Sequence, residues 1–563
     1  MSARHIQIGV FGLIVITVGF FLLYPIFSLL ITSFETNEFG RPLAYGVKNW
    51  DTIFGQIKLL DALWNTVSLS ATRTALSIVL GVALAWLIAR TNLPGRQWLE
   101  VGFWIALFMP ALPVTLGWVF LLENRSGLLN VWLMKLPFVS EPLFNIYSWW
   151  GIVWVHMMGA TLAIKVFLLV PAFRGMDSSL EEAGRTSGAN VWIVLKRIVV
   201  PMMAPTILVV LLLGVIKAMQ AFEIELILGT PARIEVYSTV IYRAMSQEPP
   251  NHGMASALSI AFLLMIVPLV VAQQWYSRRH EHASISGKFR NRTQDLGRWR
   301  WPIFAIVLAL LTLMTIVPFI FLLISTFMKM FGLFAMDQPW TDAHWIRALT
   351  RGDMMRALWN SLRLGVTASV SGMIIFAGIA YLVARTKLPG RRILDFLTWM
   401  PALVPGVVLS LGLLQLFTGV AFLRPFYGTM GVLVVAILIG AVTVGTQLIS
   451  GALRQIGAEL EEAAWAAGGS RFYTFRRVVL PLIAPTVAVI GLEIFASANS
   501  AVAIISLLGT GATQPLSILQ LVLIDSGRFE AGAVAGIIIM ILTIGSAFLA
   551  RYIATKAGLA AAN

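Results

Sequence analysis

Apolar runs long enough to cross a lipid bilayer recur along the whole of this chain, and they restrict its fold more than any other feature. A helix needs about 20 mainly apolar residues to cross the hydrocarbon core. Because lipid offers the backbone no hydrogen-bond partners, a chain that crosses it must form helices or a closed barrel. Runs of this length predict an all-α polytopic membrane protein. We place twelve spans at 6–34, 63–89, 97–122, 148–171, 204–228, 253–276, 301–327, 358–384, 393–418, 428–452, 484–508 and 529–550.

The distribution of charge supports a membrane protein and predicts its orientation. Only 12% of the residues are charged, whereas a soluble chain carries about 25%. The formal net charge of +15 would suit a nucleic-acid partner, but Lys and Arg gather in the segments that would lie on one side of the membrane. This asymmetry predicts that both termini are cytoplasmic. We therefore expect anionic lipid headgroups, and no nucleic acid, beside the basic segments.

The chain also carries an internal duplication. LWNTVSLSATRTALSIVLGVALAWLIARTNLPGR (63–96) matches LWNSLRLGVTASVSGMIIFAGIAYLVARTKLPGR (358–391), and YPIFSLLITSF (24–34) matches VPFIFLLISTF (317–327). Each copy holds six spans, an even number, so the sequence predicts two parallel six-helix repeats with the same orientation. We expect a first half at 1–276, a basic cytoplasmic linker at 277–300 and a second half at 301–563.

A polar segment interrupts each half between its fourth and fifth spans, at about 172–203 and 453–483. Its central part reads EEAGRTSGANVWIVLKRIVVP (181–201) in the first half and EEAAWAAGGSRFYTFRRVVLP (461–481) in the second. The composition predicts two short helices along the membrane surface, joined at a glycine that permits a close turn. A single copy would also fit an amphipathic connector that lies on lipid headgroups. The repetition of the same spacing favours a docking element for another protein.

This segment resembles the EAA loop of the permeases of binding-protein-dependent ATP-binding cassette (ABC) importers, in the order Glu-Ala-Ala, Gly and a final Pro. The resemblance covers essentially the whole chain and extends to the fused permeases of the iron(III) and thiamine importer group, which implies a type I importer permease fold. It implies that each loop forms a coupling helix in a cleft of a cytoplasmic ATPase. The first copy departs from the motif at its third position, which predicts unequal docking of the two loops. The implied coupling residues are Glu182, Ala183, Gly184 and Gly188 in the first loop and Glu462, Ala463, Ala464 and Gly468 in the second.

The resemblance also implies partners and a location. They are a dimer of cytoplasmic ATP-binding cassette subunits, a periplasmic or other extracytoplasmic solute-binding protein, and the bacterial inner membrane. The chain lacks the G-x-x-x-x-G-K-[ST] motif, and Gly287-Lys288 has neither the upstream glycine nor the hydroxyl, so ATP and Mg²⁺ are expected in the partner ATPase. No arrangement of nucleophile and base predicts catalysis, and His280 and His282 in the linker are expected to be ordinary loop residues and not metal ligands.

Ionisable residues inside spans are costly and are functional-site hypotheses. In the fifth span of the first half, Lys217, Gln220 and Glu223 would share about a third of the helix circumference, with Glu225 on the opposite side. The matching span of the second half places three polar residues on one face, at i, i+4 and i+7. The candidate translocation pathway consists of Lys217, Gln220, Glu223, Glu225, Glu493, Ser497 and Ser500. Structural pairing between helices is the alternative role.

Other polar residues in the spans are expected to be structural. Lys165 is expected to extend toward the cytoplasm from the end of its span. Arg73 and Arg363 occupy equivalent spans at positions that do not match, and are interpreted as structural or outer-mouth charges. His156 is expected to be a packed polar residue and not a ligand.

Together these features predict the permease of an ATP-driven importer, for iron(III) or a similar small cationic or complexed solute. A proton-coupled secondary transporter is the first alternative, because it also combines six spans with six. It has no need for a duplicated docking loop. An integral membrane enzyme that acts on lipids is a second alternative, and it would need acids or histidines clustered at one membrane face.

Overall fold

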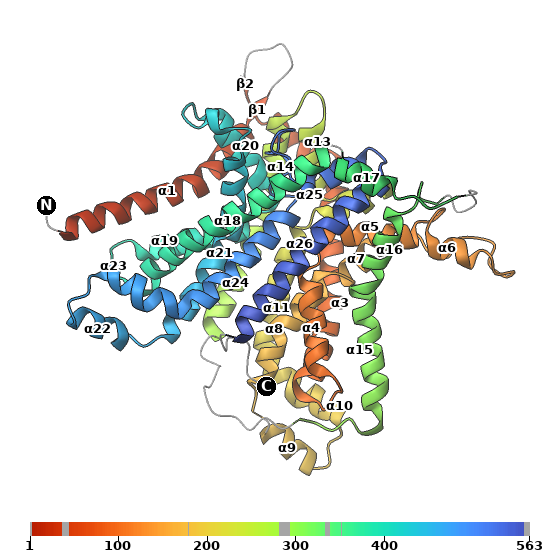
Figure 1. The fold of residues 1–563 in the computed structure, drawn as a ribbon, viewed down its shortest axis with the longest axis horizontal. Helices are drawn as coiled ribbons and strands as arrows, with labels where there is room; N and C mark the ends of the chain where they lie inside the picture. Colours follow the sequence, from red (N-terminus) through yellow and green to blue (C-terminus); the bar gives the residue numbers. More distant parts are fainter. Residues whose placement is uncertain are drawn as a thin grey trace. The chain divides into compact units, whose positions relative to one another are not determined.

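The computed structural model describes residues 3–36, 44–177, 179–280, 293–332, 338–350 and 352–556, and these residues are mostly helical (Figure 1). Ten helices are long and apolar enough to cross a membrane, and two bent helix pairs raise the number to twelve. The prediction of an all-α polytopic protein with about twelve spans is confirmed. A short antiparallel ribbon pairs β1 (Glu35–Thr36) with β2 (Ala44–Tyr45).

The chain forms two compact units, each built from separate stretches of sequence. Unit 1 consists of Met1–Gly55, Val240–Leu263 and Ala343–Asn563, and unit 2 of Gln56–Thr239 and Leu264–Asp342. The helices of unit 1 are α1 (Ala3–Thr32), α2 (Lys48–Gly55), α17 (Ala343–Thr350), α18 (Gly352–Arg385), α19 (Arg391–Trp399), η5 (Met400–Leu403), α20 (Gly406–Gly419), η6 (Arg424–Phe426), α21 (Met430–Gln455), α22 (Glu459–Ala466), α23 (Arg471–Thr474), η7 (Phe475–Val479), α24 (Leu480–Ser500), α25 (Leu516–Asp525) and α26 (Phe529–Lys556).

The helices of unit 2 are α3 (Ile57–Arg90), α4 (Arg96–Phe108), α5 (Ala111–Leu122), α6 (Leu128–Leu133), α7 (Trp149–Met157), α8 (Ala160–Arg174), α9 (Ser179–Thr186), α10 (Val191–Val194), η1 (Leu195–Val199), α11 (Val200–Met219), η2 (Glu225–Gly229), α12 (Thr230–Ala232), η4 (Gly297–Trp299), α15 (Arg300–Met314) and α16 (Ile316–Thr326). Helices α13 (Tyr237–Ser246) and α14 (His252–His280) contribute residues to both units.

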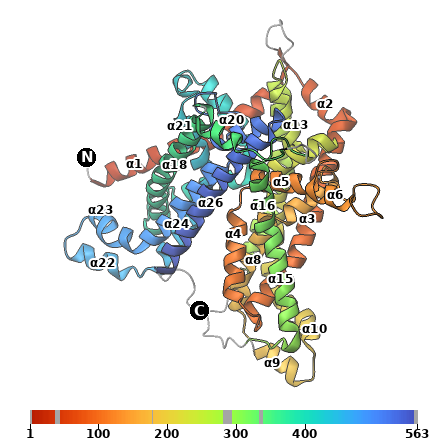
Figure 2. The same ribbon diagram turned by 45° about the vertical axis from the view of Figure 1, so that its right-hand side comes forward.

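The compact units do not coincide with the two halves of the repeat. The first span of each half packs in the other unit, and Val240–Leu263 of the first half also belongs to unit 1. Helix α1 packs against α19 and α20 in unit 1, while α15 and α16 pack against α4 and α5 in unit 2. Figure 2 shows α15 beside α4. The segments 1–276 and 301–563 are therefore units of sequence, and packing exchanges their first helices.

A matched glycine–proline contact holds each exchanged helix. A Cβ atom on Gly117 of α5 would lie 2.2 Å from the carbonyl oxygen of Pro318 in α16. A Cβ atom on Gly412 of α20 would lie 2.8 Å from Cβ of Pro25 in α1. The two glycines, and the two prolines, occupy matching positions of the repeat. Glycine is needed at both positions because the helix backbones approach too closely for a side chain.

Two predicted spans are bent, which corrects the continuous helices expected at 97–122 and 393–418. Helices α4 and α5 meet at 99°, and the helix pair Arg391–Leu403 and Gly406–Gly419 meets at 114°. Both bends precede a proline, where Met109 and Val404 adopt extended backbone conformations. A residue before proline avoids the α region, and proline itself lacks the N–H that would continue the helix.

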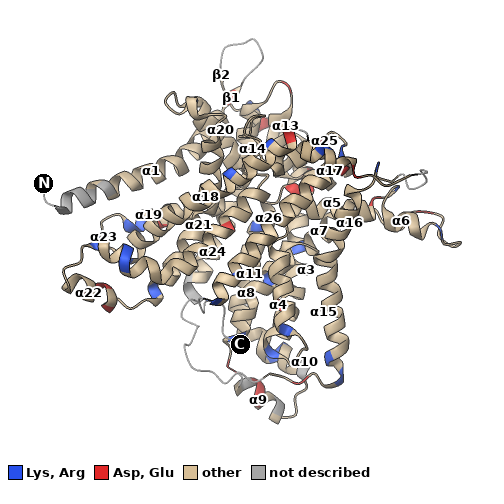
Figure 3. Cartoon of the chain, viewed as in Figure 1, with Lys and Arg blue, Asp and Glu red and all other residues tan. Residues whose placement is uncertain are grey.

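Charged residues lie mainly toward the ends of the spans. Figure 3 shows most of the length of the spans free of charge, with Lys and Arg near α10 and the start of α15 in unit 2. In unit 1, Lys and Arg gather near α19 and α23. Basic residues therefore accompany the predicted coupling loop in both units, as the positive-inside rule requires of a cytoplasmic face.

Candidate functional site

In each predicted coupling loop a short helix is followed by a glycine turn, and the helix after the turn continues without a break into the next span. In unit 2, α9 is followed by the turn at Gly188 and by α10, and in unit 1, α22 is followed by the turn at Gly468 and by α23. Both glycines have φ of 85°, a conformation that other residues rarely adopt. The predicted first helix and glycine turn are present in both loops. The predicted separate second helix is wrong, because Pro201 and Pro481 lie in a helix that runs on into the next span. The role of the loops in docking stays a prediction.

A buried ion pair fastens each loop to the second span of its half, α3 or α18, and it uses the first glutamate of each Glu-Glu pair. In unit 2, Arg90 at the end of α3 donates to Oε1 of Glu181 at 2.7 Å and to the carbonyl of Met176 at 3.1 Å. Both charged side chains are almost fully buried. The Arg90–Glu181 pair therefore joins α9 directly to α3.

An ion pair recurs at the matching positions of unit 1, although its two charged atoms do not meet in hydrogen-bond geometry among the described residues. Nε of Arg385 lies 3.2 Å from Oε1 of Glu461, and its Nη2 donates to the carbonyl of Ile456 at 2.5 Å and to that of Leu453. Sequence reasoning missed both anchors because it considered only the loop motif. The signal was available, since the arginine of ART-x-LPGR and the double glutamate both occur in each half.

The second glutamates, which were the predicted docking acids, differ in exposure. Glu462 and Ala463 are exposed on α22. Glu182 is half-buried, and its Oε1 is buried without a hydrogen-bond partner in the part of the chain that the structure describes. The second coupling loop, which lies in unit 1, also exposes aromatic side chains: Phe472 is 72% exposed and Tyr473 is 56% exposed. Exposed aromatic side chains are enriched at protein interfaces, and the second loop carries two of them.

The glycine that departs from the motif has a packing reason. A Cβ atom on Gly184 would lie 2.7 Å from Cδ1 of Ile198. At the matching positions, loop 2 carries the larger Ala464 with the smaller Val478. The first residue is one methyl group larger in the second loop, and the second residue is one methylene group smaller. The total side-chain volume of the pair is therefore nearly the same in both loops.

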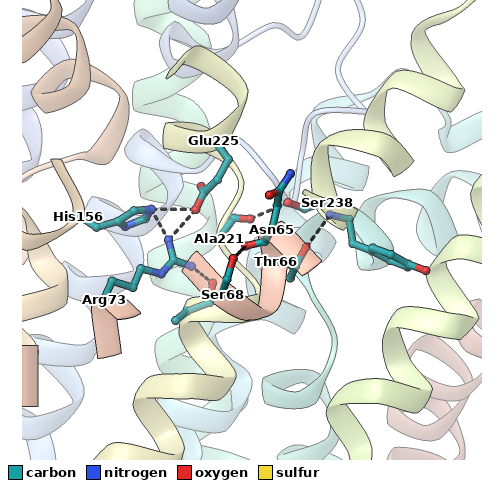
Figure 4. Close-up of polar contacts among 10 residues, drawn as sticks. Asn65, Thr66, Ser68, Arg73, His156, Ala221, Glu225 and Ser238 are labelled. Atoms are coloured by element: carbon teal, nitrogen blue, oxygen red, sulfur yellow. Dashed lines mark hydrogen bonds and ion pairs between the residues drawn. The ribbon is translucent and has the colours of Figure 1, made fainter. Parts of the chain in front are cut away.

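A charged network lies inside the helices of unit 2 (Figure 4). Nη1 of Arg73 in α3 donates to Oε1 of Glu225 at 2.5 Å, and Nε2 of His156 in α7 lies 2.9 Å from the same oxygen. Arg73 also contacts His156 and donates to the carbonyl of Ala218. All three ionisable side chains are buried. The network joins three separate segments, so Arg73 and His156 are part of one buried cluster and not isolated structural residues.

The position of Glu225 depends on a break in the predicted fifth span. Helix α11 ends at Met219, and the chain continues helically only after Phe222. The last carbonyl groups of a helix have no partner inside it, and Arg73 satisfies the one at Ala218. The expected single helix face is therefore wrong for this span, because the helix ends before Glu223.

The predicted pathway residues of unit 2 have separate surroundings. Nζ of Lys217 is exposed and donates to Oε1 of Gln220 at 3.4 Å. Glu223 and Glu225 line a cavity of about 130 Å³ together with His156, Thr161 and apolar side chains such as Met109 and Phe222. Oε2 of Glu225 has no hydrogen-bond partner among the described residues. The cavity thus brings two carboxylates and an imidazole to one place.

In unit 1, α24 is continuous to Ser500, so Glu493, Ser497 and Ser500 share one helix face as predicted. All three are partly buried, and Oγ of Ser500 donates to the carbonyl of Ala496 at 2.9 Å. Their role in a pathway stays a prediction.

The prediction that Lys165 extends toward the cytoplasm is wrong. It is only 4% exposed and does not extend to the cytoplasm. A Cβ atom on Gly81 of α3 would lie 2.6 Å from Cβ of Lys165 in α8. The lysine stem therefore fills the space that this glycine leaves. Arg363 is exposed, and its interpretation as a structural or outer-mouth charge stays a prediction.

A set of hydrogen bonds near this network is repeated in both units. Nδ2 of Asn65 donates to the carbonyl of Glu235 at 3.1 Å. Oγ of Ser238 donates to the carbonyl of Ala221 at 2.6 Å (Figure 4). The backbone N–H of Tyr237 donates to Oγ1 of Thr66 at 3.0 Å. In unit 1 the corresponding bonds run from Asn360 to Gln514, from Ser517 to Ala501 and from Leu516 to Ser361.

The described residues contain no group of three or more potential metal ligands close enough to hold an ion. His280 lies at the end of α14, and His282 and the segment Gly287-Lys288 lie outside the described residues.

Comparisons with known proteins give a consistent result. A family model described as "Binding-protein-dependent transport system inner membrane component" matches residues 77–282 and 370–558. The chain is 28% identical to a probable ABC transporter permease, y4fN, of Sinorhizobium fredii, over 76% of this chain and 75% of that protein. It is 24% identical to the ferric transport system permease FbpB of Actinobacillus pleuropneumoniae, over 96% and 77%. It is 28% identical to the molybdenum transport system permease ModB of Escherichia coli, over 39% and 96%.

Proposed function

This chain belongs to the family of binding-protein-dependent transport system inner membrane components and is the permease of an ABC importer, and we propose that the solute it carries is iron(III). The observation that carries this proposal is the similarity to a ferric transport permease over 96% of the chain. The molybdenum permease covers only 39% of the chain, about one half of the repeat. The fused arrangement is therefore shared with the ferric relative.

The cavity in unit 2 supports a cationic solute. Glu223, Glu225 and His156 supply carboxylate oxygens and an imidazole nitrogen, which are groups that iron accepts as ligands. They do not form a complete metal site within the described residues. Weak contacts suit a permease, because a transported ion must leave each site as readily as it enters.

The energy for transport is proposed to come from a pair of cytoplasmic ATPases that dock on the two coupling loops. Glu462 and the exposed rings of Phe472 and Tyr473 offer a surface for this contact. The Arg90–Glu181 and Arg385–Glu461 pairs would carry the movement of the loops into α3 and α18. A solute-binding protein would deliver iron from the other side of the membrane.

The test is uptake into proteoliposomes that contain the permease, the ATPase subunits and the binding protein of its own gene neighbourhood. We expect uptake of ⁵⁵Fe(III) that needs ATP inside the liposome and resists competition by molybdate or sulfate. ATP-driven uptake of molybdate or sulfate in place of iron would overturn the solute and leave the permease function intact. Iron uptake driven by a proton gradient without nucleotide would overturn the ATP-driven mechanism.

A further inference from the structure

The end of the linker between the two halves is bound to the turn that follows α3, and one of its side chains reaches the first coupling loop. Residues 293–297 follow the undescribed part of the linker, and Gln294 pairs with Thr91 as an isolated parallel bridge. The backbone N–H of Gln294 donates to the carbonyl of Arg90 at 2.7 Å, and the N–H of Asn92 donates to the carbonyl of Gln294 at 2.9 Å. This short stretch is thereby held against the residue that anchors the loop.

Side chains strengthen the same attachment. Nδ2 of Asn92 donates to Oδ1 of Asp295 at 2.5 Å, and the N–H of Leu296 donates to Oδ1 of Asn92 at 2.9 Å. The side chain of Gln294 points inward and is only 4% exposed. Its Nε2 donates to Oε2 of Glu181 at 2.5 Å. Oε1 of Glu181 therefore accepts a hydrogen bond from Arg90, and Oε2 accepts one from Gln294 in the linker.

Unit 1 satisfies the matching carboxylate without a linker. Oε2 of Glu461 accepts a hydrogen bond at 3.1 Å from the hydroxyl of Tyr381, which lies in α18 itself. The residue of α3 that matches Tyr381 in the repeat is Trp86. Nε1 of Trp86 is buried and makes no hydrogen bond within the described part of the chain. Gln294 thus takes the place of the hydroxyl that Trp86 lacks.

We propose that Gln294 is a positioning residue, through which the linker between the halves holds the first coupling helix, α9, in its docking orientation. A buried carboxylate oxygen that loses its donor is costly to leave unsatisfied. Without Gln294, Glu181 is expected to turn toward water, and α9 to loosen from α3. In the second loop no linker residue is needed, because Tyr381 in α18 donates the matching hydrogen bond to Glu461.

The functional consequence rests on the proposed function, in which α9 contacts an ATPase. The structural claim is independent of it and is tested first, on the purified permease alone. The chain contains no cysteine, so a single cysteine introduced at exposed Ala183 or at exposed Ala463 takes one spin label. The mobility of the label reports how firmly α9 or α22 is held.

Gln294→Ala is expected to raise the mobility of the label at position 183 and to leave the label at position 463 unchanged. Tyr381→Phe, the matched control, is expected to do the reverse. Adding Trp86→Tyr to Gln294→Ala supplies the missing hydroxyl and should restore the mobility at position 183. Unchanged mobility at 183 in Gln294→Ala, or an equal rise at both positions, would overturn the proposal.

The second measurement is the ATPase activity of the assembled transporter, stimulated by the loaded binding protein. Gln294→Ala is expected to lower the stimulated rate about tenfold, the size expected for loss of a hydrogen bond to a charged group. Trp86→Tyr in addition should recover most of the rate. A change in label mobility without any change in ATPase rate would keep the attachment but reject its role in coupling, and would count against the proposed docking of the loops.

Discussion

In unit 2, Arg73, His156 and Glu225 form a buried charged network, whereas the matching positions of unit 1 hold Ala368, Ala436 and Ile505, all fully buried. The hydrogen bonds from Asn65 and Asn360 nearby are the same in both units. Apolar residues of suitable size often replace a buried ionic cluster without loss of stability. Folding alone therefore does not require these charges, and their presence in one unit points to a task that the other unit does not share.

A second contrast concerns packing. Gly81 faces Lys165 in unit 2, and at the same two positions in unit 1 Phe376 faces Gly445. The large residue has moved from one helix to the other. A similar exchange relates Gly184 and Ile198 to Ala464 and Val478. In the comparison of the two units, a small residue on one helix faces a large residue on the other, and the helix that carries the large residue differs between the units.

The largest expected effect comes from breaking the charged network. Glu225→Ile alone should lower the free energy of unfolding by about 3–5 kcal/mol, because it leaves Arg73 buried without its partner. The triple variant Arg73→Ala, His156→Ala, Glu225→Ile copies unit 1 and should recover most of this loss. Denaturation in detergent measures both.

Transport by the triple variant then separates structure from function. A stable triple variant that no longer carries iron would place the network in the pathway. If the triple variant is as unstable as Glu225→Ile, the apolar residues of unit 1 cannot replace the charged network in unit 2. That result would contradict the conclusion that folding does not require these charges.

The next effect tests the contacts that hold the exchanged helices. Gly117→Ala should cost about 1–3 kcal/mol, because the new Cβ atom meets the backbone carbonyl of Pro318. Gly412→Ala should cost less, since its nearest neighbour, Cβ of Pro25, is farther away. Gly378→Ala is the control, because no atom lies within 4 Å of its Cβ position. Equal melting temperatures for all three variants would contradict the matched contacts.

A smaller effect distinguishes the two docking acids. Glu462→Lys should weaken binding of the ATPase about tenfold, because it reverses an exposed charge on the proposed docking surface. Glu182→Lys should weaken binding less, because this side chain is half-buried. Pull-down of the ATPase from detergent is the measurement. Unchanged binding in both variants would reject the coupling-loop interpretation.

The smallest effect concerns the glycine that departs from the motif. Gly184→Ala should destabilise the first loop by about 1 kcal/mol, since its Cβ atom overlaps the end of the Ile198 side chain. Adding Ile198→Val reproduces the pair found in loop 2 and should remove the cost. Hydrogen exchange of α9 measures the change. If α9 exchanges as fast in the double variant as in Gly184→Ala, the smaller side chain at position 198 does not compensate for the larger one at position 184.

Much of the architecture was predictable because its signals are local. A run of apolar residues is enough to place a helix in the membrane, and the repeated motif locates both coupling loops and their glycine turns. The bends at Met109 and Val404 were also readable, since a proline follows each of them. The site was predicted only in part, because Glu223 was assigned to a helix that ends at Met219.

By itself, therefore, the sequence determined the helical membrane fold, the duplication and the position of the two loops with their glycine turns. The tertiary structure decided which unit each first helix joins, which glutamate of each pair becomes the anchor, and that Arg73 meets Glu225. These outcomes depend on residues far apart in the chain, such as Gly117 with Pro318 and Gln294 with Glu181. Hydropathy and motif spacing describe neighbours along the chain, whereas a buried charge is stable only where distant segments supply its partner.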